Sequence, residues 1–275
     1  MGRALDGVTV VKVGGELLET VARAQALARA ISPLASDGPL VIVHGGGREI
    51  DAECARRGLA KVAVDGLRVT DGPTLDAVVA ALAGTINTRF VAALVLAGLR
   101  AVGLTGADAA CVRVAPAPPY RAASGRDVDL GLVGQPLPAH PPALVGDLVG
   151  LGYVPVLACL GTDSAGALYN VNADTLAAHV AATCGAARLL VTGGTPGVLD
   201  RDGATIAELT LEQAEALVAD GTASAGMVAK LAACCEAVRA GVTDVRIVTG
   251  TTSATLDFAP GTRLTAAARP PAPLG

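Results

Sequence analysis

Short apolar runs alternate along this chain with longer segments of helical periodicity, and this alternation limits the fold more than any other feature. Six runs rich in β-branched residues are predicted to be strands, at 8–13, 40–44, 100–104, 153–158, 188–192 and 244–249. Helices are predicted between them, at 17–32, 74–98, 175–185, 209–221 and 227–241. Several of the strands are apolar at consecutive positions, as strands buried on both faces are. The chain is therefore predicted to be an α/β protein with a mostly parallel sheet covered by helices.

Composition excludes several classes of partner. Hydrophobic residues make up 52% of the 275 residues, which is enough for a sizeable core, but only 2% are aromatic. Platforms on which the bases of single-stranded nucleic acid could stack are therefore not expected. The net charge is -4 and no basic run occurs, which argues against nucleic acid or an anionic membrane as a partner. Every apolar run long enough to span a bilayer is interrupted by glycine, proline or charge.

The cysteines give no sign of a metal site or a disulfide framework. There are six cysteines without a CxxC pair, and only three histidines. This pattern predicts no zinc site and no other metal ligands. Reduced thiols fit a cytoplasmic protein, and the first ten residues lack the apolar core of a signal peptide.

Two proline-rich segments, 115–127 and 135–142, interrupt the middle of the chain. They predict a surface hairpin and a loop at the junction between two lobes. The lobes are predicted to span residues 1–160 and 161–268. Residues 269–275 are predicted to be a disordered tail.

The stretch "VIVHGGGREI" (41–50) places three consecutive glycines between a predicted strand and a helix. Glycine is costly to order, and its lack of a side chain lets backbone N–H groups approach an anion at the positive end of a helix. A Walker loop would need lysine and then Ser or Thr after the last glycine, but Arg48 and Glu49 follow here. A tight turn without a ligand remains the alternative interpretation.

A second glycine turn strengthens the anion-site interpretation. Lys12 lies near the end of the first predicted strand, followed by Val13, Gly14 and Gly15. Glycine turns at the carboxyl ends of neighbouring parallel strands lie side by side, where open α/β sheets bind ligands. The chain has eighteen arginines but only three lysines, at positions 12, 61 and 230. Such scarce lysines are candidates for positions that need a compact ammonium group beside a phosphoryl group.

Ten motifs, in order, resemble those of the amino acid kinase superfamily and, within it, the acetylglutamate kinases. They extend from about Val8 to about Arg263 and read "VVKVGG", "VIVHGGG", "DGLRVTD", "ALAGTINTRFV", "AVGLTGAD", "DLGLVG", "GYVPVLACLG", "YNVNADTLAAHVA", "GVL" and "GMVAK". The resemblance implies an open three-layer α/β/α sandwich with a mostly parallel central sheet. The N-terminal lobe would then bind the acyl acceptor and form a homodimer, and the C-terminal lobe would bind ATP with Mg2+.

The implied reaction transfers the γ-phosphoryl group of ATP to the γ-carboxylate of N-acetyl-L-glutamate. The product would be N-acetyl-L-glutamyl 5-phosphate, formed early in arginine biosynthesis. Such a transfer needs little covalent chemistry from the protein, because it depends on holding two anions in line and neutralising their charge. Magnesium would enter as MgATP.

The resemblance also implies roles for individual residues. Lys12, Lys230 and Asp174 resemble the catalytic group, with Asp174 holding both lysines; Asp174 could also serve as first-turn charge of a helix capped by Asn172. Arg68 would bind a substrate carboxylate through its planar fork. The remaining implied substrate ligands are Asn170, Gly46 and Gly47. The implied nucleotide or phosphate ligands are Gly14, Gly15, Gly193, Gly194, Gly197, Gly226 and Met227.

Two departures from the family pattern carry expectations. Gly193 stands where these kinases usually have Asp or Asn, so we expect altered or weakened ATP affinity that Gly193→Asp improves. The first predicted strand begins near Val8, which leaves no room for the N-terminal helix that joins dimers of arginine-inhibited members into a hexamer. A dimer that is insensitive to arginine is therefore expected.

Two alternatives stay open at this point. One is a related acyl kinase that acts on another carboxylate, such as carrier-bound aminoadipate or glutamate, or an aspartate or carbamate kinase. The other is a catalytically silent amino-acid sensor that keeps the fold. Retention of Lys12, Asp174 and Lys230 argues against the sensor.

Overall fold

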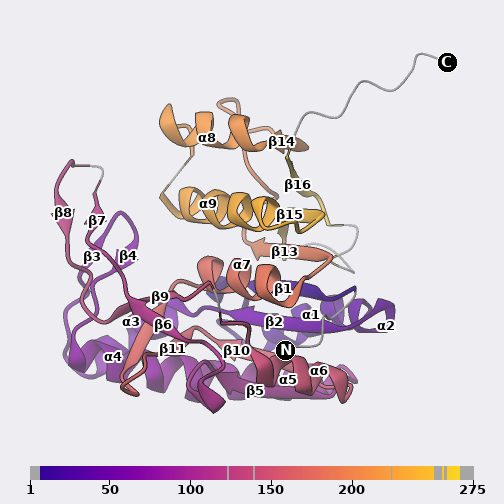
Figure 1. Ribbon diagram of the computed structural model, residues 1–275, viewed down its shortest axis with the longest axis horizontal. Coiled ribbons are helices and arrows are strands. Elements are labelled where there is room, and N and C mark those ends of the chain that lie inside the picture. Colours follow the sequence, from indigo (N-terminus) through magenta and orange to yellow (C-terminus); the bar gives the residue numbers. More distant parts are fainter. Residues whose placement is uncertain are drawn as a thin grey trace.

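The computed structural model describes residues 7–122, 124–138, 140–223, 225–250, 256 and 259–266. Its centre is an eight-stranded sheet with the order β14-β16-β15-β13-β1-β2-β10-β5 (Figure 1). The strands are β1 (Thr9–Val13), β2 (Leu40–His44), β5 (Ala101–Thr105), β10 (Val154–Ala158), β13 (Arg188–Gly193), β14 (Glu208–Thr210), β15 (Asp244–Thr249) and β16 (Gly261–Thr265). The six predicted strands are all present, and β14 and β16 extend the sheet beyond them.

Neighbouring strands of this sheet are parallel except for β15 and β16, which are antiparallel. The helices around it are α1 (Val21–Ile31), α2 (Leu34–Asp37), α3 (Gly47–Arg56), α4 (Gly72–Val79), α5 (Asn87–Leu96), α6 (Ala143–Gly150), α7 (Ala173–Cys184), α8 (Leu211–Ala219) and α9 (Ala225–Arg239). The connection from β1 to β2 moves along the sheet in the opposite direction to the connection from β13 to β15. Since such crossovers are right-handed, their helices cover opposite faces. The predicted mostly parallel α/β sandwich is confirmed.

Two helix pairs dominate the packing. Helix α7 packs against α9 and also contacts β1, β2 and β13, while α9 lies over β13, β15 and β16 (Figure 1). Helix α1 packs against α5, which covers β5 and β10. The core is aliphatic, as the composition predicts, and Phe90 on α5 is its largest fully buried side chain among the described residues.

Helix α1 begins later than predicted. Residues Gly15–Leu17 form a short 3-10 turn, η1, and α1 starts only at Val21. Thr20 is the N-cap, and its hydroxyl accepts a hydrogen bond from the Arg23 N–H (3.2 Å). A side-chain cap of this kind fixes where a helix begins, and it outweighs the helical periodicity of the preceding residues.

The segment predicted as one helix at 74–98 is a continuous helical rod with an irregular centre. A π-helical stretch, η2 (Ala80–Ile86), joins α4 to α5. The rod, Gly72–Leu96, is long and apolar enough to cross a membrane by length and composition. It packs here as a core helix, with Phe90 and Leu94 fully buried.

Smaller sheets stand beside the main sheet (Figure 1). One has the order β11-β12-β9-β6, and two further hairpins are β3–β4 and β7–β8. Their strands are β3 (Ala63–Val64), β4 (Leu67–Arg68), β6 (Val114–Pro116), β7 (Tyr120–Arg121), β8 (Asp127–Val128), β9 (Val133–Pro136), β11 (Leu160–Thr162) and β12 (Leu168–Val171). The β7–β8 hairpin lies in the first proline-rich segment, as predicted, and a short turn, η3 (Asp108–Ala110), precedes it.

The main sheet is built in two halves that follow the chain. Strands β1, β2, β5 and β10 all precede residue 160, and β13, β14, β15 and β16 all follow it. The predicted lobe boundary at 160/161 falls inside β11. All six cysteines are buried free thiols. The predicted tail at 269–275 lies outside the described residues.

Candidate active site

The two glycine turns lie side by side at the carboxyl ends of β1 and β2. These strands pair in parallel with Val13 opposite His44, and the Gly45 N–H donates to the Val13 carbonyl (3.2 Å). A Cβ atom on Gly15 would lie only 2.7 Å from the Cα of Gly46. The two backbones therefore touch at a distance that only glycine permits.

Gly46 is also enclosed on its other side. A Cβ atom there would lie 2.0 Å from Cδ1 of Ile86, which belongs to the π-helical stretch η2. Gly47, by contrast, begins α3, is exposed, and has open space where a Cβ would be. The turn thus combines a tightly packed glycine with an exposed glycine that begins a helix.

An ion pair lies beside these turns. The Lys12 ammonium is 2.9 Å from Oδ1 of Asp174, and both side chains are less than a tenth exposed. Lys12 projects from β1. The backbone of β1 is held at this point by a hydrogen bond that the Thr192 hydroxyl of β13 donates to the Lys12 carbonyl (2.9 Å). Burial disfavours the charged Lys12, but attraction to Asp174, their hydrogen bond and attraction to Glu16 outweigh it and raise the Lys12 pKa.

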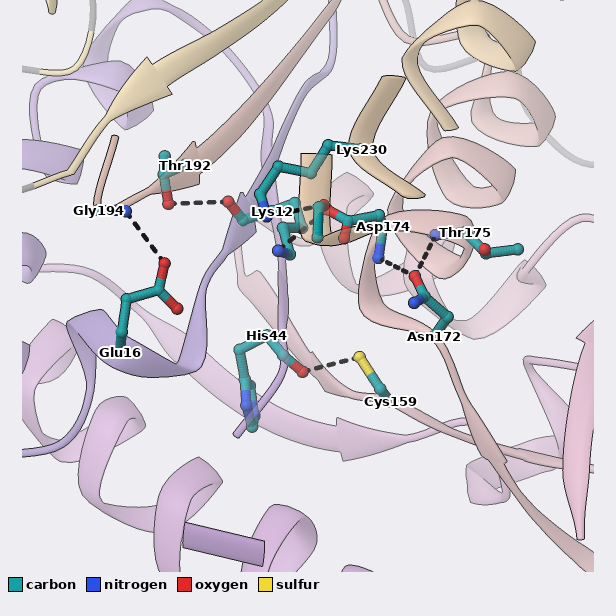
Figure 2. Close-up of polar contacts among 11 residues, drawn as sticks. Lys12, Glu16, His44, Cys159, Asn172, Asp174, Thr175, Thr192, Gly194 and Lys230 are labelled. Carbon is teal, nitrogen blue, oxygen red and sulfur yellow. Dashed lines mark hydrogen bonds and ion pairs between the residues drawn. The ribbon is translucent and has the colours of Figure 1, made fainter. Parts of the chain in front are cut away.

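Asp174 is positioned by a helix cap. The side chain of Asn172, the N-cap of α7, accepts hydrogen bonds from the N–H groups of Asp174 (2.8 Å) and Thr175 (3.1 Å). The predicted cap is therefore confirmed, and it places Asp174 in the first turn. The same carboxylate pairs with Lys12, so its place in the first turn of the helix and its contact with that lysine are compatible (Figure 2). Its predicted role for both lysines stays a prediction.

Lys230 approaches the same place from α9. Its Cε lies 3.6 Å from the position of a Cβ on Gly193, and its ammonium donates to the Gly226 carbonyl one turn earlier (3.4 Å). Burial, followed by repulsion from Lys12, lowers the pKa of Lys230 although Asp174 and Glu16 attract it. Figure 2 shows Lys12, Lys230 and Asp174 converging from three different elements.

Glu16 links the first glycine turn to the strand on the other side. It follows Gly15 in η1, and its Oε1 accepts a hydrogen bond from the Gly194 N–H (3.0 Å). A Cβ on Gly193 would lie 3.3 Å from the same oxygen. The improvement in ATP affinity predicted for Gly193→Asp stays a prediction, and Glu16 already faces the space that the new side chain would enter.

Arg68 lies beside the second glycine turn. Its guanidinium donates to the Gly47 carbonyl (3.3 Å) and pairs with Asp51 of α3. Lys61 also contacts Asp51 (2.8 Å). Burial favours the neutral form of Asp51, but hydrogen bonds from Lys61 and Arg68 outweigh it and lower the Asp51 pKa. In this structure the planar fork predicted to hold a substrate carboxylate holds a protein carboxylate.

Asn170 joins this side of the site through Thr70. Its Nδ2 donates to the Thr70 hydroxyl (3.3 Å), and that hydroxyl donates to the Arg68 carbonyl (3.4 Å). Thr70 is fully buried. Arg68 and Asn170, the two side chains predicted to bind the acyl acceptor, are therefore linked through Thr70 although they are about a hundred positions apart in the sequence.

The family follows from comparison with known proteins. A model of the amino acid kinase family matches residues 7–249. The chain belongs to the amino acid kinase family. An acetylglutamate kinase of Acidiphilium cryptum is 41% identical over 255 residues, covering 90% of this chain and 85% of the relative. An acetylglutamate kinase of Solibacter usitatus is 39% identical over 242 residues, covering 88% and 90%.

Solved structures share the fold of this amino acid kinase. A protein of Streptococcus mutans UA159 is 25% identical, with a TM-score of 0.76, and the match covers 94% of this chain and 99% of that one. An N-acetylglutamate synthase of Neisseria gonorrhoeae, complexed with coenzyme A and L-arginine, has a TM-score of 0.81 at 24% identity; the match covers 96% and 62%. The carbamate kinase of Giardia has a TM-score of 0.67 at 15% identity.

The glycines predicted to bind the nucleotide fall into distinct environments. Gly193 ends β13 and Gly194 is exposed beyond it. Gly197 has a φ of +117°, and a Cβ there would lie 2.7 Å from the Thr262 hydroxyl, which accepts from the Val198 N–H. Glycine is therefore required at position 197 by the backbone conformation and the packing, whether or not a nucleotide binds there. The remaining predicted residues, Gly226 and Met227, lie in the first turn of α9.

Sequence reasoning missed a buried pair, His44 and Asn87, beside the second glycine turn. His44 Nε2 lies 3.0 Å from Nδ2 of Asn87, which also donates to the Val156 carbonyl (2.9 Å). His44 Nδ1 lies 3.2 Å from the Gly45 carbonyl, so the ring is neutral with its proton on Nδ1. Burial lowers the His44 pKa to about 4 although that hydrogen bond opposes the shift. The only hint of this pair in the sequence was the position of His44 directly before the three glycines.

Among the described residues, no group of three or more His, Cys, Asp or Glu side chains could hold a metal ion. Mg2+ is usually held by substrate phosphates, water and only one or two carboxylates, so an ion that arrives with ATP would not need such a group. The positive charge that the protein itself offers comes from Lys12 and Lys230.

Proposed function

We propose that this protein is an ATP-dependent acetylglutamate kinase. It transfers the γ-phosphoryl group of MgATP to the γ-carboxylate of N-acetyl-L-glutamate and forms N-acetyl-L-glutamyl 5-phosphate, in arginine biosynthesis. The observation that carries the proposal is the buried Lys12–Asp174 pair beside two touching glycine turns. Relatives about 40% identical over about 90% of the chain, all acetylglutamate kinases by name, support the choice of acceptor.

The proposed chemistry needs no general base. A γ-carboxyl group has a pKa of about 4.3, so at neutral pH the acceptor is already ionised. One of its oxygens forms a bond to the γ-phosphorus, the bond to the β–γ bridging oxygen breaks, and ADP leaves with that electron pair. The barrier is then one of bringing two anions together, and fixed positive charge in a partly desolvated site lowers it.

The chain supplies that charge from both sides. Lys12 is kept charged by Asp174, and its fixed position suits the transferring phosphoryl group. Lys230 comes from the helix beside β13 and suits the nucleotide phosphates. Backbone N–H groups of Gly14, Gly46 and Gly47 add dipoles, since glycine lets phosphate oxygens approach closely.

The acceptor is assigned to the N-terminal lobe and the nucleotide to the C-terminal lobe. Arg68 and Asn170 lie near the second glycine turn, where they would bind the carboxylate and amide groups of acetylglutamate. Gly193, Gly194, Gly197, Gly226 and Met227 would line the nucleotide site. The lobe assignment, the homodimer and the cytoplasmic location belong to this proposal.

A hydroxylamine trap for acyl phosphate tests the choice of acceptor. MgATP is offered with N-acetyl-L-glutamate, L-glutamate, L-aspartate, aminoadipate, and bicarbonate plus ammonia in separate reactions. Hydroxamate from acetylglutamate alone is the expected result. Product with another acceptor would keep a kinase and change its substrate, whereas no product despite thermal stabilisation by ligands would favour a sensor or a carrier-bound substrate.

A further inference from the structure

Glu16 occupies an unusual place for an acidic residue. Its carboxylate accepts the hydrogen bond of the Gly194 N–H (3.0 Å) across the line between β1 and β13 (Figure 2). Gly194 is exposed at the end of β13, in the loop assigned to the nucleotide, and its N–H is a donor that a phosphate oxygen could use. A carboxylate of the protein itself therefore occupies an N–H donor that could bind an anion.

The space around the Glu16 carboxylate is shaped by glycines. A Cβ on Gly14 would lie 2.5 Å from Oε1 and 2.6 Å from Oε2, and a Cβ on Gly193 would lie 3.3 Å from Oε1. The room that these two glycines leave between the strand ends is thus occupied by a carboxylate. It is the same room that glycine turns provide for the phosphate chain of a nucleotide.

The charge of Glu16 also reaches both lysines. Its Coulombic attraction favours the charged form of both: it adds to the raised pKa of Lys12 and opposes the lowering of the pKa of Lys230, although neither ammonium contacts it as closely as the Gly194 N–H does. Before a nucleotide arrives, Asp174 and Glu16 together balance the two ammonium groups. A nucleotide phosphate would meet that balanced charge rather than two free cations.

We propose that Glu16 is an intramolecular competitor for the nucleotide phosphates and so sets the affinity of the enzyme for ATP. The inference rests on the proposed nucleotide site. A single N–H cannot serve the carboxylate and a phosphate oxygen together, and two anions in the space between Gly14 and Gly193 repel each other. The Glu16 side chain must therefore leave its place when MgATP binds, and the energy of its contacts is subtracted from the binding energy.

The test compares nucleotide affinity with and without the charge. Dissociation constants of MgATP, metal-free ATP and adenosine are measured by calorimetry for the wild type, Glu16→Gln and Glu16→Ala. Glu16→Gln keeps an oxygen that can accept from Gly194 and removes only the charge, so it tests the inference even if Glu16→Ala fails to fold. Glu212→Gln, an exposed position in the first turn of α8, is the matched control.

Glu16→Gln and Glu16→Ala are expected to bind MgATP about tenfold tighter or more, since a hydrogen bond to a charged group no longer has to be broken. Adenosine, which has no phosphate, should bind all four proteins alike. Unchanged or weaker MgATP binding in Glu16→Gln would overturn the inference. Weaker MgATP binding with unchanged metal-free ATP binding would assign the carboxylate to the metal instead. A wild type that binds no adenine nucleotide would contradict the proposed function itself.

Discussion

The ammonium group of Lys12 lies 2.9 Å from Oδ1 of Asp174, and the two residues come from elements more than 150 positions apart in the chain. Their side chains are 6% and 9% exposed, so each charge depends on the other. Removing one partner of a buried pair leaves an uncompensated charge, which costs far more than the pair itself contributes. The pair is therefore both part of the proposed catalytic arrangement and a point on which the stability of the fold depends.

Asp174→Asn should destabilise the protein by about 3 to 5 kcal/mol, because the buried Lys12 ammonium loses its counter-charge. Urea unfolding at neutral pH measures the loss. Asp202→Asn, in an exposed loop, is the control and should change stability by less than about 0.5 kcal/mol. Equal stability of Asp174→Asn and the wild type would show that Lys12 is not buried beside Asp174.

Lys12→Arg keeps the charge but should lower kcat by about a hundredfold or more, the size of effect seen when one charge-stabilising donor is lost. The guanidinium is planar and larger than an ammonium, so it cannot take the same buried position beside Asp174. Initial rates with saturating substrates measure the change. Lys61→Arg, whose side chain is 60% exposed, serves as control. Near-normal turnover of Lys12→Arg would remove Lys12 from the chemistry.

Arg68→Ala should raise the KM for acetylglutamate by about tenfold or more, as expected for a lost charge-assisted hydrogen bond, and leave the KM for ATP nearly unchanged. Arg56→Ala is the control, because Arg56 is exposed on the neighbouring helix α3. Steady-state kinetics with each substrate varied in turn make the distinction. If only the ATP constant changed, the assignment of substrates to lobes would be wrong.

Gly15→Ala should destabilise the protein by about 1 to 3 kcal/mol and lower activity, because the new methyl group would meet the backbone of Gly46 at 2.7 Å. Stability is lost because the two glycine turns can make room for the methyl group only if β1 or β2 shifts. Gly47→Ala is the matched control for stability, since its Cβ would meet nothing within 4 Å. Thermal unfolding of both variants tests the loss of stability, and initial rates of Gly15→Ala against the wild type test the loss of activity. Similar behaviour of the two would show that the turns are not in contact.

Stability should fall as the pH drops from 6.5 towards 4, partly because of His44. Burial holds the His44 pKa at about 4 in the folded protein, whereas the unfolded chain titrates near 6.5. In that window the unfolded state binds more protons, so stability rises with pH and the full His44 contribution is present above pH 6.5. At 1.36 kcal/mol per unit of pKa difference, the effect reaches about 3 kcal/mol at pH 4.

The His44 contribution is measured as the difference in the free energy of unfolding between pH 7 and pH 4.5. His44→Gln should reduce this difference by about 2 to 3 kcal/mol relative to the wild type. Carboxylates titrate in the same range, but they are common to both proteins. An identical pH dependence of His44→Gln and the wild type would contradict the buried neutral imidazole.

Much of the fold could be predicted because apolar periodicity reports burial directly. All six predicted strands are in the main sheet, and the Asn172 cap was readable from its sequence position. Strand β14 could not be predicted, because its three residues are too few to show a periodicity. The start of α1 was also missed, because the helix begins at the Thr20 cap and not where its apolar pattern begins. Local patterns do not reveal where short or capped elements begin.

The site could be predicted only in part, for a related reason. Lys12 and the glycines stand in recognisable local motifs, so they were found. Glu16, Asp51 and Asn87 act on residues brought close by the fold, and their partners Gly194, Arg68 and His44 lie from 17 to 178 positions away. Such contacts carry no local signature in one sequence.

The most direct test of the account is the stoichiometry of phosphoryl transfer. Hydroxamate and ADP are measured together after the wild type is incubated with MgATP, N-acetyl-L-glutamate and hydroxylamine, with Lys230→Ala run in parallel. Equal amounts of acetylglutamyl hydroxamate and ADP are expected from the wild type, and neither above background from Lys230→Ala. ADP without hydroxamate, or equal product from Lys230→Ala, would contradict it.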